Sequence, residues 1–212
     1  MAQTPDNSAV SRFDALQNYR TGRDLEARGR TDEAERYYAE AVRICQEEIA
    51  RNAANMDSYT VLTWTLQRQR KYGEVVSWGQ RALQVQSDYR IIETLGEAYF
   101  YLGNYSESLR NMQRYANALP QGDRASVAYF FIGEIFRIQN KFFLADIAYT
   151  TAVRLEPGSA LWWYRLGTVR ESAGDAAPAA EAYEQALRLN ANYQEAREGL
   201  ERVRPTAPGL RA

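Results

Sequence analysis

Apolar residues recur along most of the chain at spacings of three and four, in stretches about a dozen residues long, as on one face of an α-helix. Gly29, Gly103 and Gly174 interrupt this pattern where a glycine suits the C-terminal cap of a helix. Asn104 with Glu107 three residues later is typical of a helix start. The sequence therefore predicts pairs of short helices joined by tight turns, which is an all-α fold.

The helix pairs are repeated in tandem. Gly167 follows Gly133 by 34 residues, and Gly96, Thr63 and Gly22 hold the equivalent position in the earlier units. Three units then place two alanines, with a tyrosine between them, at matching positions: Ala34, Tyr38 and Ala41; Ala145, Tyr149 and Ala152; Ala179, Tyr183 and Ala186. The other two units depart from this pattern, with Val75 and Tyr115 where alanine is usual. Small residues that alternate with large ones allow neighbouring helices to interlock.

This pattern resembles the tetratricopeptide repeat, whose helix-turn-helix unit has a period of 34 residues. The resemblance implies a right-handed α-solenoid of about five helix hairpins plus a C-terminal capping helix. We expect a flexible arm over 1–10, one repeat domain over 11–204 and a flexible tail over 205–212. The expected repeats lie near 15–55, 56–88, 89–122, 126–159 and 160–193, with the cap at 194–204.

Several positions depart from the repeat. Gly79 stands where a large aromatic residue is usual, and we expect Trp78 to fill that space. Residues 123–125 read as a longer loop. The first unit has seven extra residues, so its second helix should extend to Arg51 or Asn55. That extension is either a harmless long helix or an overhang that shields a partner.

Composition argues against several kinds of catalytic site. The chain has no histidine and a single cysteine, so serine–histidine pairs, histidine zinc sites and intrachain disulfides are excluded. With 26 Lys and Arg against 27 Asp and Glu, no basic block indicates nucleic acid. Glu93, Glu97 and Glu134 could imitate a carboxylate pair, but such spacing is typical of a helix surface. We expect no enzyme, no cofactor and no metal.

No apolar stretch is long enough to cross a membrane, so no membrane insertion is expected. The first residues lack the basic and apolar regions of a signal peptide. As written, the chain reads as soluble and cytoplasmic, or periplasmic if a signal was removed before Met1.

In the resembled family, the first helices of successive units line a concave surface that docks peptides. The register assigns the following residues to that surface: Tyr19, Arg20, Arg23, Thr60, Trp64, Arg68, Arg90, Glu93, Glu97, Tyr101, Phe130, Phe131, Glu134, Arg137, Tyr164, Arg165 and Thr168. Arginine and aromatic residues are common interface anchors. A peptide with acidic and apolar groups could meet Arg20, Arg23 and Arg68 beside Trp64. The alternative is a mixed, solvated face without a dedicated ligand.

A chaperone carboxylate clamp is not expected, because no three consecutive units supply its two asparagines. Aromatic residues in excess of the repeat pattern, among them Trp162 and Phe143, leave self-association or a docked partner open. The prediction is a non-catalytic adaptor that binds a protein or peptide. The alternative is an envelope-associated accessory protein that binds a small ligand or a transporter component.

Overall fold

The computed structural model describes residues 14–204, which form helices joined by short turns and contain no strand. Eleven helices lie within this range: α1 (Ala15–Ala27), α2 (Thr31–Arg51), α3 (Met56–Arg68), α4 (Tyr72–Val85), α5 (Tyr89–Tyr101), α6 (Tyr105–Ala118), α7 (Ala125–Ile138), α8 (Phe142–Leu155), α9 (Ala160–Ala173), α10 (Ala176–Leu189) and α11 (Gln194–Val203). The all-α prediction is confirmed. The arm expected at 1–10 and the tail expected at 205–212 lie outside the described residues.

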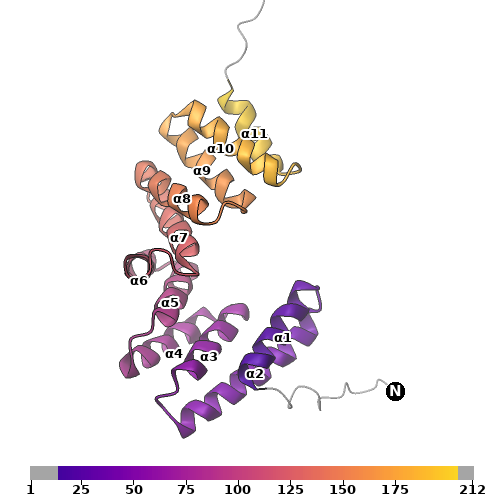
Figure 1. Ribbon diagram of the computed structural model, residues 1–212, viewed down its shortest axis with the longest axis vertical. Helices are drawn as coiled ribbons and strands as arrows, with labels where there is room; N and C mark the ends of the chain where they lie inside the picture. Colours follow the sequence, from indigo (N-terminus) through magenta and orange to yellow (C-terminus); the bar gives the residue numbers. More distant parts are fainter. Residues whose placement is uncertain (1–13, 205–212) are drawn as a thin grey trace, which may run out of the picture. The chain divides into compact units, whose positions relative to one another are not determined.

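The chain divides into two compact units, Met1–Asn111 and Met112–Ala212. In the first unit, each helix from α1 to α4 packs against the next, and α3 also contacts α1 and α5. In the second unit, α7 to α11 pack in the same sequential way, and α11 also contacts α9 (Figure 1). Within each unit, helix hairpins therefore stack one on the next, as expected for a repeat fold.

The turn inside each hairpin has one residue in the left-handed region. Gly29, Gly103 and Gly174 occupy it in three hairpins, as the sequence predicts, with φ of 74°, 75° and 87°. Arg70 and Asn140 occupy the same place in the other two, with φ of 57° and 56°. In all five turns the next amide donates to a carbonyl five residues earlier, which closes the helix in a Schellman motif. The geometry of the turn is thus kept where glycine is absent.

Glycine on the first helix of a hairpin makes room for a tyrosine on the second. A Cβ on Gly22, Gly133 or Gly167 would lie 2.6 Å from the ring of the tyrosine sixteen residues later. In the second hairpin the two sizes are exchanged: Thr63 takes the glycine position and Gly79 takes the tyrosine position. The prediction that Trp78 fills the space at Gly79 is wrong.

Leu95 of α5 fills that space instead, because a Cβ on Gly79 would lie 2.8 Å from its side chain. Trp78 packs on Tyr59, with the ring centroids 6.2 Å apart. The helix that follows therefore compensates for the missing aromatic ring, and the side chain next to Gly79 does not.

The extra length of the first unit lies in α2, which ends at Arg51 as predicted. Its last turns bury Cys45 and Ile49 in the same apolar cluster as Ala15 and Leu62. Ser58 at the start of α3 donates to Glu48 at 2.5 Å. The extension is consequently part of the packed core on its inner face.

The connection before α7 covers 119–124 and is longer than the other connections between hairpins, as expected, but it ends one residue earlier than predicted. Ala125 is the first residue of α7 and is buried, because α7 begins within the segment expected to be a loop. Tyr115 stands where the repeat usually has a small residue, and its hydroxyl accepts from the amide of Arg124 at 3.3 Å. The large side chain of Tyr115 in α6 thus stabilises the connection to α7 by this hydrogen bond.

Candidate protein-binding surfaces

The residues predicted to line a binding surface lie on the first helix of each hairpin. In the first unit these helices are α1, α3 and α5, and in the second they are α7 and α9. The structure brings many of the predicted residues together within each unit. It also shows that most of the charged ones already have partners in the chain.

Aromatic residues join α1 and α3. The ring of Tyr19 lies 5.9 Å from that of Trp64 and 6.4 Å from that of Tyr38, measured between centroids. Tyr19 and Trp64 are partly exposed, whereas Tyr38 is buried. Arg20 and Arg23 on α1 are exposed, and Arg23 lies 3.4 Å from Asp24. An aromatic pair with cationic neighbours thus borders solvent on this face.

Arg68 is held by a carboxylate of the neighbouring hairpin. Its guanidinium donates to Glu26 at 2.6 and 2.9 Å, and Tyr38 donates to the same carboxylate at 2.7 Å. Burial alone would raise the pKa of Glu26, but the hydrogen bonds from Tyr38 and Arg68 outweigh it and lower the pKa below 4.5. Burial and the Glu26 carboxylate raise the pKa of Tyr38. Glu26 therefore stays ionised at neutral pH and compensates the charge of Arg68.

The remaining charged residues predicted in the first unit are also engaged. Arg90 contacts Asp57 at 3.0 Å and Asp88 at 2.7 Å. The side-chain amide of Gln67 donates to Glu97, which is 8% exposed, while Glu93 is 4% exposed. The acids placed in the middle of the predicted surface are thus buried.

The predicted residue Thr60 is also buried, and its hydroxyl donates to the carbonyl of Met56 at 2.9 Å.

Tyr101, the last predicted residue of the first unit, is 53% exposed at the end of α5. Its ring stacks on Tyr72 with centroids 4.7 Å apart. One face of the ring is therefore covered by a neighbouring hairpin, and the residue forms part of an aromatic cluster with Phe100 and Tyr105.

The second unit has a buried carboxylate at its centre. Glu134 of α7, 6% exposed, lies 2.8 Å from Arg137 and 3.1 Å from Arg165 of α9. Tyr149 of α8 also donates to Glu134. Burial, and then the nearby carboxylate, raise the pKa of Tyr149. Two guanidinium groups on one carboxylate leave this part of the α7–α9 face with an excess positive charge.

The predicted aromatic residues of this unit pack on one another. Phe130 stacks on Trp162 with centroids 5.2 Å apart, and Phe131 is buried. Tyr164 lies 5.1 Å from Tyr193, centroid to centroid, and carries Arg165 above its ring at 5.7 Å. Thr168 is partly buried, and its hydroxyl donates to the carbonyl of Arg165. Of the aromatic residues in excess of the repeat, Phe143 is 75% exposed.

Sequence reasoning missed the carboxylates that tie hairpins together. Glu26 and Glu171 each lie four residues after a glycine of the repeat, Gly22 and Gly167. Glu171 accepts from Tyr183 at 2.5 Å and from Arg202 at 2.7 Å, as Glu26 accepts from Tyr38 and Arg68. That shared spacing is a signal that could have found the pair.

We next consider metal-binding and nucleophilic side chains among the described residues. They contain no group of three or more histidine, cysteine or carboxylate side chains arranged to hold a metal ion. Cys45 is buried, which raises the pKa of its thiol to about 12 and keeps it protonated. Among residues 14–204, no helix has the length and apolar character to cross a bilayer.

Tetratricopeptide-repeat family models match residues 22–49 and 144–194. These two segments are tetratricopeptide repeats. No curated protein sequence matches the chain. Solved tetratricopeptide structures share its fold at low identity.

MamA residues 41-end from Desulfovibrio magneticus RS-1 is 18% identical, with a TM-score of 0.61 over 84% of this chain and 96% of its own. TTC0263 from Thermus thermophilus is 16% identical, with a TM-score of 0.63 over 89% and 98%. YrrB, described as having an unusual peptide-binding site, is 16% identical, with a TM-score of 0.62 over 89% and 92%. At identities of 16–18%, these comparisons show that the fold is shared and nothing more.

Proposed function

We propose that this tetratricopeptide repeat protein is a non-catalytic module that binds a protein or peptide partner. Proteins of this repeat family generally mediate protein–protein interactions, and the similar structure YrrB has a peptide-binding site. The absence of histidine is compatible with this role, since binding needs no acid–base pair. Neither a cofactor nor a nucleic acid enters the proposal.

The observation that carries the proposal is the partly exposed Tyr19–Trp64 pair, with Arg68 one helical turn beyond Trp64. Tryptophan, tyrosine and arginine dominate the binding energy of protein interfaces, because they combine a large apolar area with a polar group. The exposed Arg20 adds a cation to the same helix as Tyr19. We therefore assign the binding surface of the first unit to the α1–α3 face.

The charge of this face defines the kind of partner. Arg68 is already compensated by Glu26 at 2.6 Å, so a partner's carboxylate would share that guanidinium with Glu26. Arg20 and Arg23 are exposed and can meet an acidic group directly. A peptide that combines an apolar side chain for the Tyr19–Trp64 pair with one acidic group fits these features best.

The test is affinity capture from native lysate, with the bound proteins identified by mass spectrometry. Trp64→Ala/Arg68→Ala should deplete the partner at least tenfold relative to wild type. The matched control is Trp78→Ala/Arg81→Ala, which removes the same residue types from α4, where Arg81 lies 5.1 Å above the Trp78 ring. Equal capture by wild type and Trp64→Ala/Arg68→Ala would overturn the assignment.

A second variant separates binding from folding. Arg20→Glu changes an exposed side chain, so the melting temperature should stay within about 1–2 °C of wild type. An acidic partner should still bind less well to it. If Arg20→Glu binds like wild type while the double variant is unfolded, the α1–α3 face does not carry the interaction.

A further inference from the structure

The outer face of α8 is apolar where it meets solvent. Phe143, Leu144 and Ile147 are 75%, 41% and 50% exposed. They lie within the first two turns of the helix, at a spacing of one and four residues, so their side chains form one patch. We call these three residues the α8 patch. Phe143 is the most exposed large apolar side chain among the described residues.

The repeat itself does not require these residues. Tyr149 corresponds to Tyr38, Gly79, Met112 and Tyr183, and this alignment gives the residues that the other second helices place at the patch. They are Asp32, Gly73, Ser106 and Ala177 for Phe143; Glu33, Glu74, Glu107 and Pro178 for Leu144; and Arg36, Ser77, Arg110 and Glu181 for Ile147. Four helices of the same kind thus fold with small or polar residues there, so the patch of α8 needs an explanation beyond folding.

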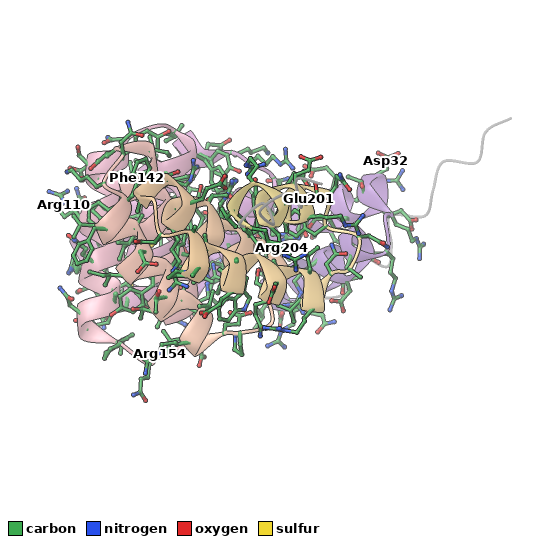
Figure 2. The ribbon with its side chains drawn as sticks, turned by 90° about the horizontal axis from the view of Figure 1, so that it is seen from above. Asp32, Arg110, Phe142, Arg154, Glu201 and Arg204 are labelled. Atoms are coloured by element: carbon green, nitrogen blue, oxygen red, sulfur yellow. The ribbon has the colours of Figure 1, made fainter. Side chains whose placement is uncertain are left out.

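The charges that α8 and its N-terminal flank present to solvent are positive. Asp146 is the only carboxylate of α8, and Arg170 binds it at 2.6 Å. Lys141 precedes the helix, and the first turn contains no acidic residue to complement the positive end of the helix dipole. Arg154 is exposed and points away from the ribbon (Figure 2). The solvent-facing side of α8 is therefore apolar and cationic.

We propose that the α8 patch docks an acidic amphipathic helix of another protein, on the side of the hairpins opposite to the first-helix face. Apolar side chains of that helix would cover Phe143, Leu144 and Ile147. Its carboxylates would complement Lys141 and Arg154 at the two ends of α8 and the uncompensated helix N-terminus. The α8 patch consists of other residues than the proposed binding face on α1 and α3.

Charge favours this occupant over a second copy of the chain. Pairing α8 with its own copy would bring Lys141 and Arg154 against like charges, which is unfavourable. A short helix with carboxylates on its rim avoids this repulsion. The three apolar side chains present on the order of 300 Å², which is below the roughly 800 Å² per partner of a standard interface, so the charged contacts must contribute to the affinity.

An anionic bilayer fits less well than an acidic helix. Arg170 contacts both α8, through Asp146, and α10, through the carbonyl of Pro178, so these helices are neighbours. Glu181 of α10 is exposed at the position equivalent to Ile147 and would face the anionic lipid. The Glu181 carboxylate would repel such a surface, whereas a single narrow helix can lie along α8 alone.

The experiment uses the full chain with a photo-crosslinking residue, Phe143→p-benzoylphenylalanine, in native lysate. Ala177→p-benzoylphenylalanine is the control, because Ala177 has the same register on α10. Crosslinked segments are mapped by mass spectrometry, and the mapped segment is made as a synthetic peptide. We expect crosslinks specific to position 143 in one segment with net negative charge and apolar residues at helical spacing.

Two variants then test the recognition with that peptide. Phe143→Asp/Leu144→Glu/Ile147→Arg restores residues that other repeats carry, so it should fold like wild type and lose at least 100-fold in affinity. Lys141→Glu/Arg154→Glu keeps the patch and should lose at least tenfold. Trp64→Ala/Arg68→Ala should bind the peptide like wild type, since it changes the other surface.

Several results would overturn the proposal. These are crosslinks from position 143 to a second copy of the chain, crosslinks to lipid only, or no segment above the Ala177 control. Equal affinity of the peptide for wild type and Lys141→Glu/Arg154→Glu would equally exclude an acidic partner.

Discussion

The hydroxyl of Tyr38 in α2 donates a hydrogen bond to the carboxylate of Glu26 in α1 at 2.7 Å. Arg68 of the next hairpin binds the same carboxylate, so one acidic group connects three helices. Tyr183, Glu171 and Arg202 repeat this arrangement between α10, α9 and α11. The tyrosine that packs against a glycine through its ring thus also fixes a carboxylate through its hydroxyl.

Removal of this hydroxyl should be costly. Tyr38→Phe keeps the ring against Gly22 but loses the hydrogen bond to an ionised acceptor, so the free energy of unfolding should fall by about 1–2 kcal/mol. Urea denaturation measures this change. Tyr37→Phe is the control, because Tyr37 is the neighbouring residue and only partly buried, and its effect should stay within about 0.5 kcal/mol. Equal effects of the two changes would contradict the role of the Tyr38 hydroxyl.

Acid should weaken this connection in a definite pH range. The pKa of Glu26 is lowered in the folded chain from an ordinary 4.5, so its contribution to stability is complete above that value. The contribution is lost as the pH falls below 4.5 and through the lowered pKa. Between pH 5 and pH 3, the urea midpoint of wild type should therefore fall more steeply than that of Glu26→Gln. Parallel declines would show that Glu26 does not titrate as proposed.

The glycine of the first helix should not tolerate a methyl group. In Gly167→Ala, the added Cβ would lie 2.6 Å from the Tyr183 ring, which must move in a packed environment. We expect a loss of about 1–3 kcal/mol, despite the better helix propensity of alanine. Gly73→Ala in α4 is the matched control, since nothing lies within 4 Å of its Cβ, and it should gain up to about 1 kcal/mol. The two melting temperatures should move in opposite directions.

Arg70 occupies a backbone conformation that suits glycine. Its φ is 57°, in the turn where other hairpins have Gly29, Gly103 and Gly174. Arg70→Gly should relieve the steric cost of a Cβ and raise the free energy of unfolding by about 0.5–1 kcal/mol. The reciprocal change, Gly174→Ala, should lower it by a similar amount. Calorimetry of both variants checks the pair, and a loss of stability in Arg70→Gly would contradict this account of the turn.

Leu144→Glu should stabilise the chain, although it removes an apolar residue. The side chain is exposed at the start of α8, where three other second helices carry glutamate. A carboxylate there complements the helix dipole and adds about 0.3–1 kcal/mol at low salt. The gain should shrink in 1 M salt because the interaction is screened. A destabilised variant would indicate that Leu144 packs against the protein itself.

The all-α repeat fold could be predicted because periodicity, turn glycines and the 34-residue repeat all indicate helix hairpins. Arg70 and Asn140 were not predicted at left-handed positions, since no local signal distinguishes them from other polar turn residues. Leu95, and not Trp78, fills the space at Gly79. This depends on how the next helix packs, which the spacing of residues in the sequence does not specify. The first-helix residues were placed correctly on their helices. Their ion pairs were missed, because partners such as Glu26 for Arg68 and Asp57 for Arg90 come from other hairpins.

Tyr183 lies between two glycines, and this has a consequence for local unfolding. A Cβ on Gly167 or on Gly199 of α11 would meet its ring at 2.6 or 2.5 Å, and Arg202 of α11 binds the carboxylate that its hydroxyl holds. Helix α11 cannot detach without uncovering the ring and separating that ion pair. Its amides should therefore exchange with solvent at the rate of the whole α9–α10 hairpin, as one cooperative opening unit, and more slowly than those of a frayed terminal helix.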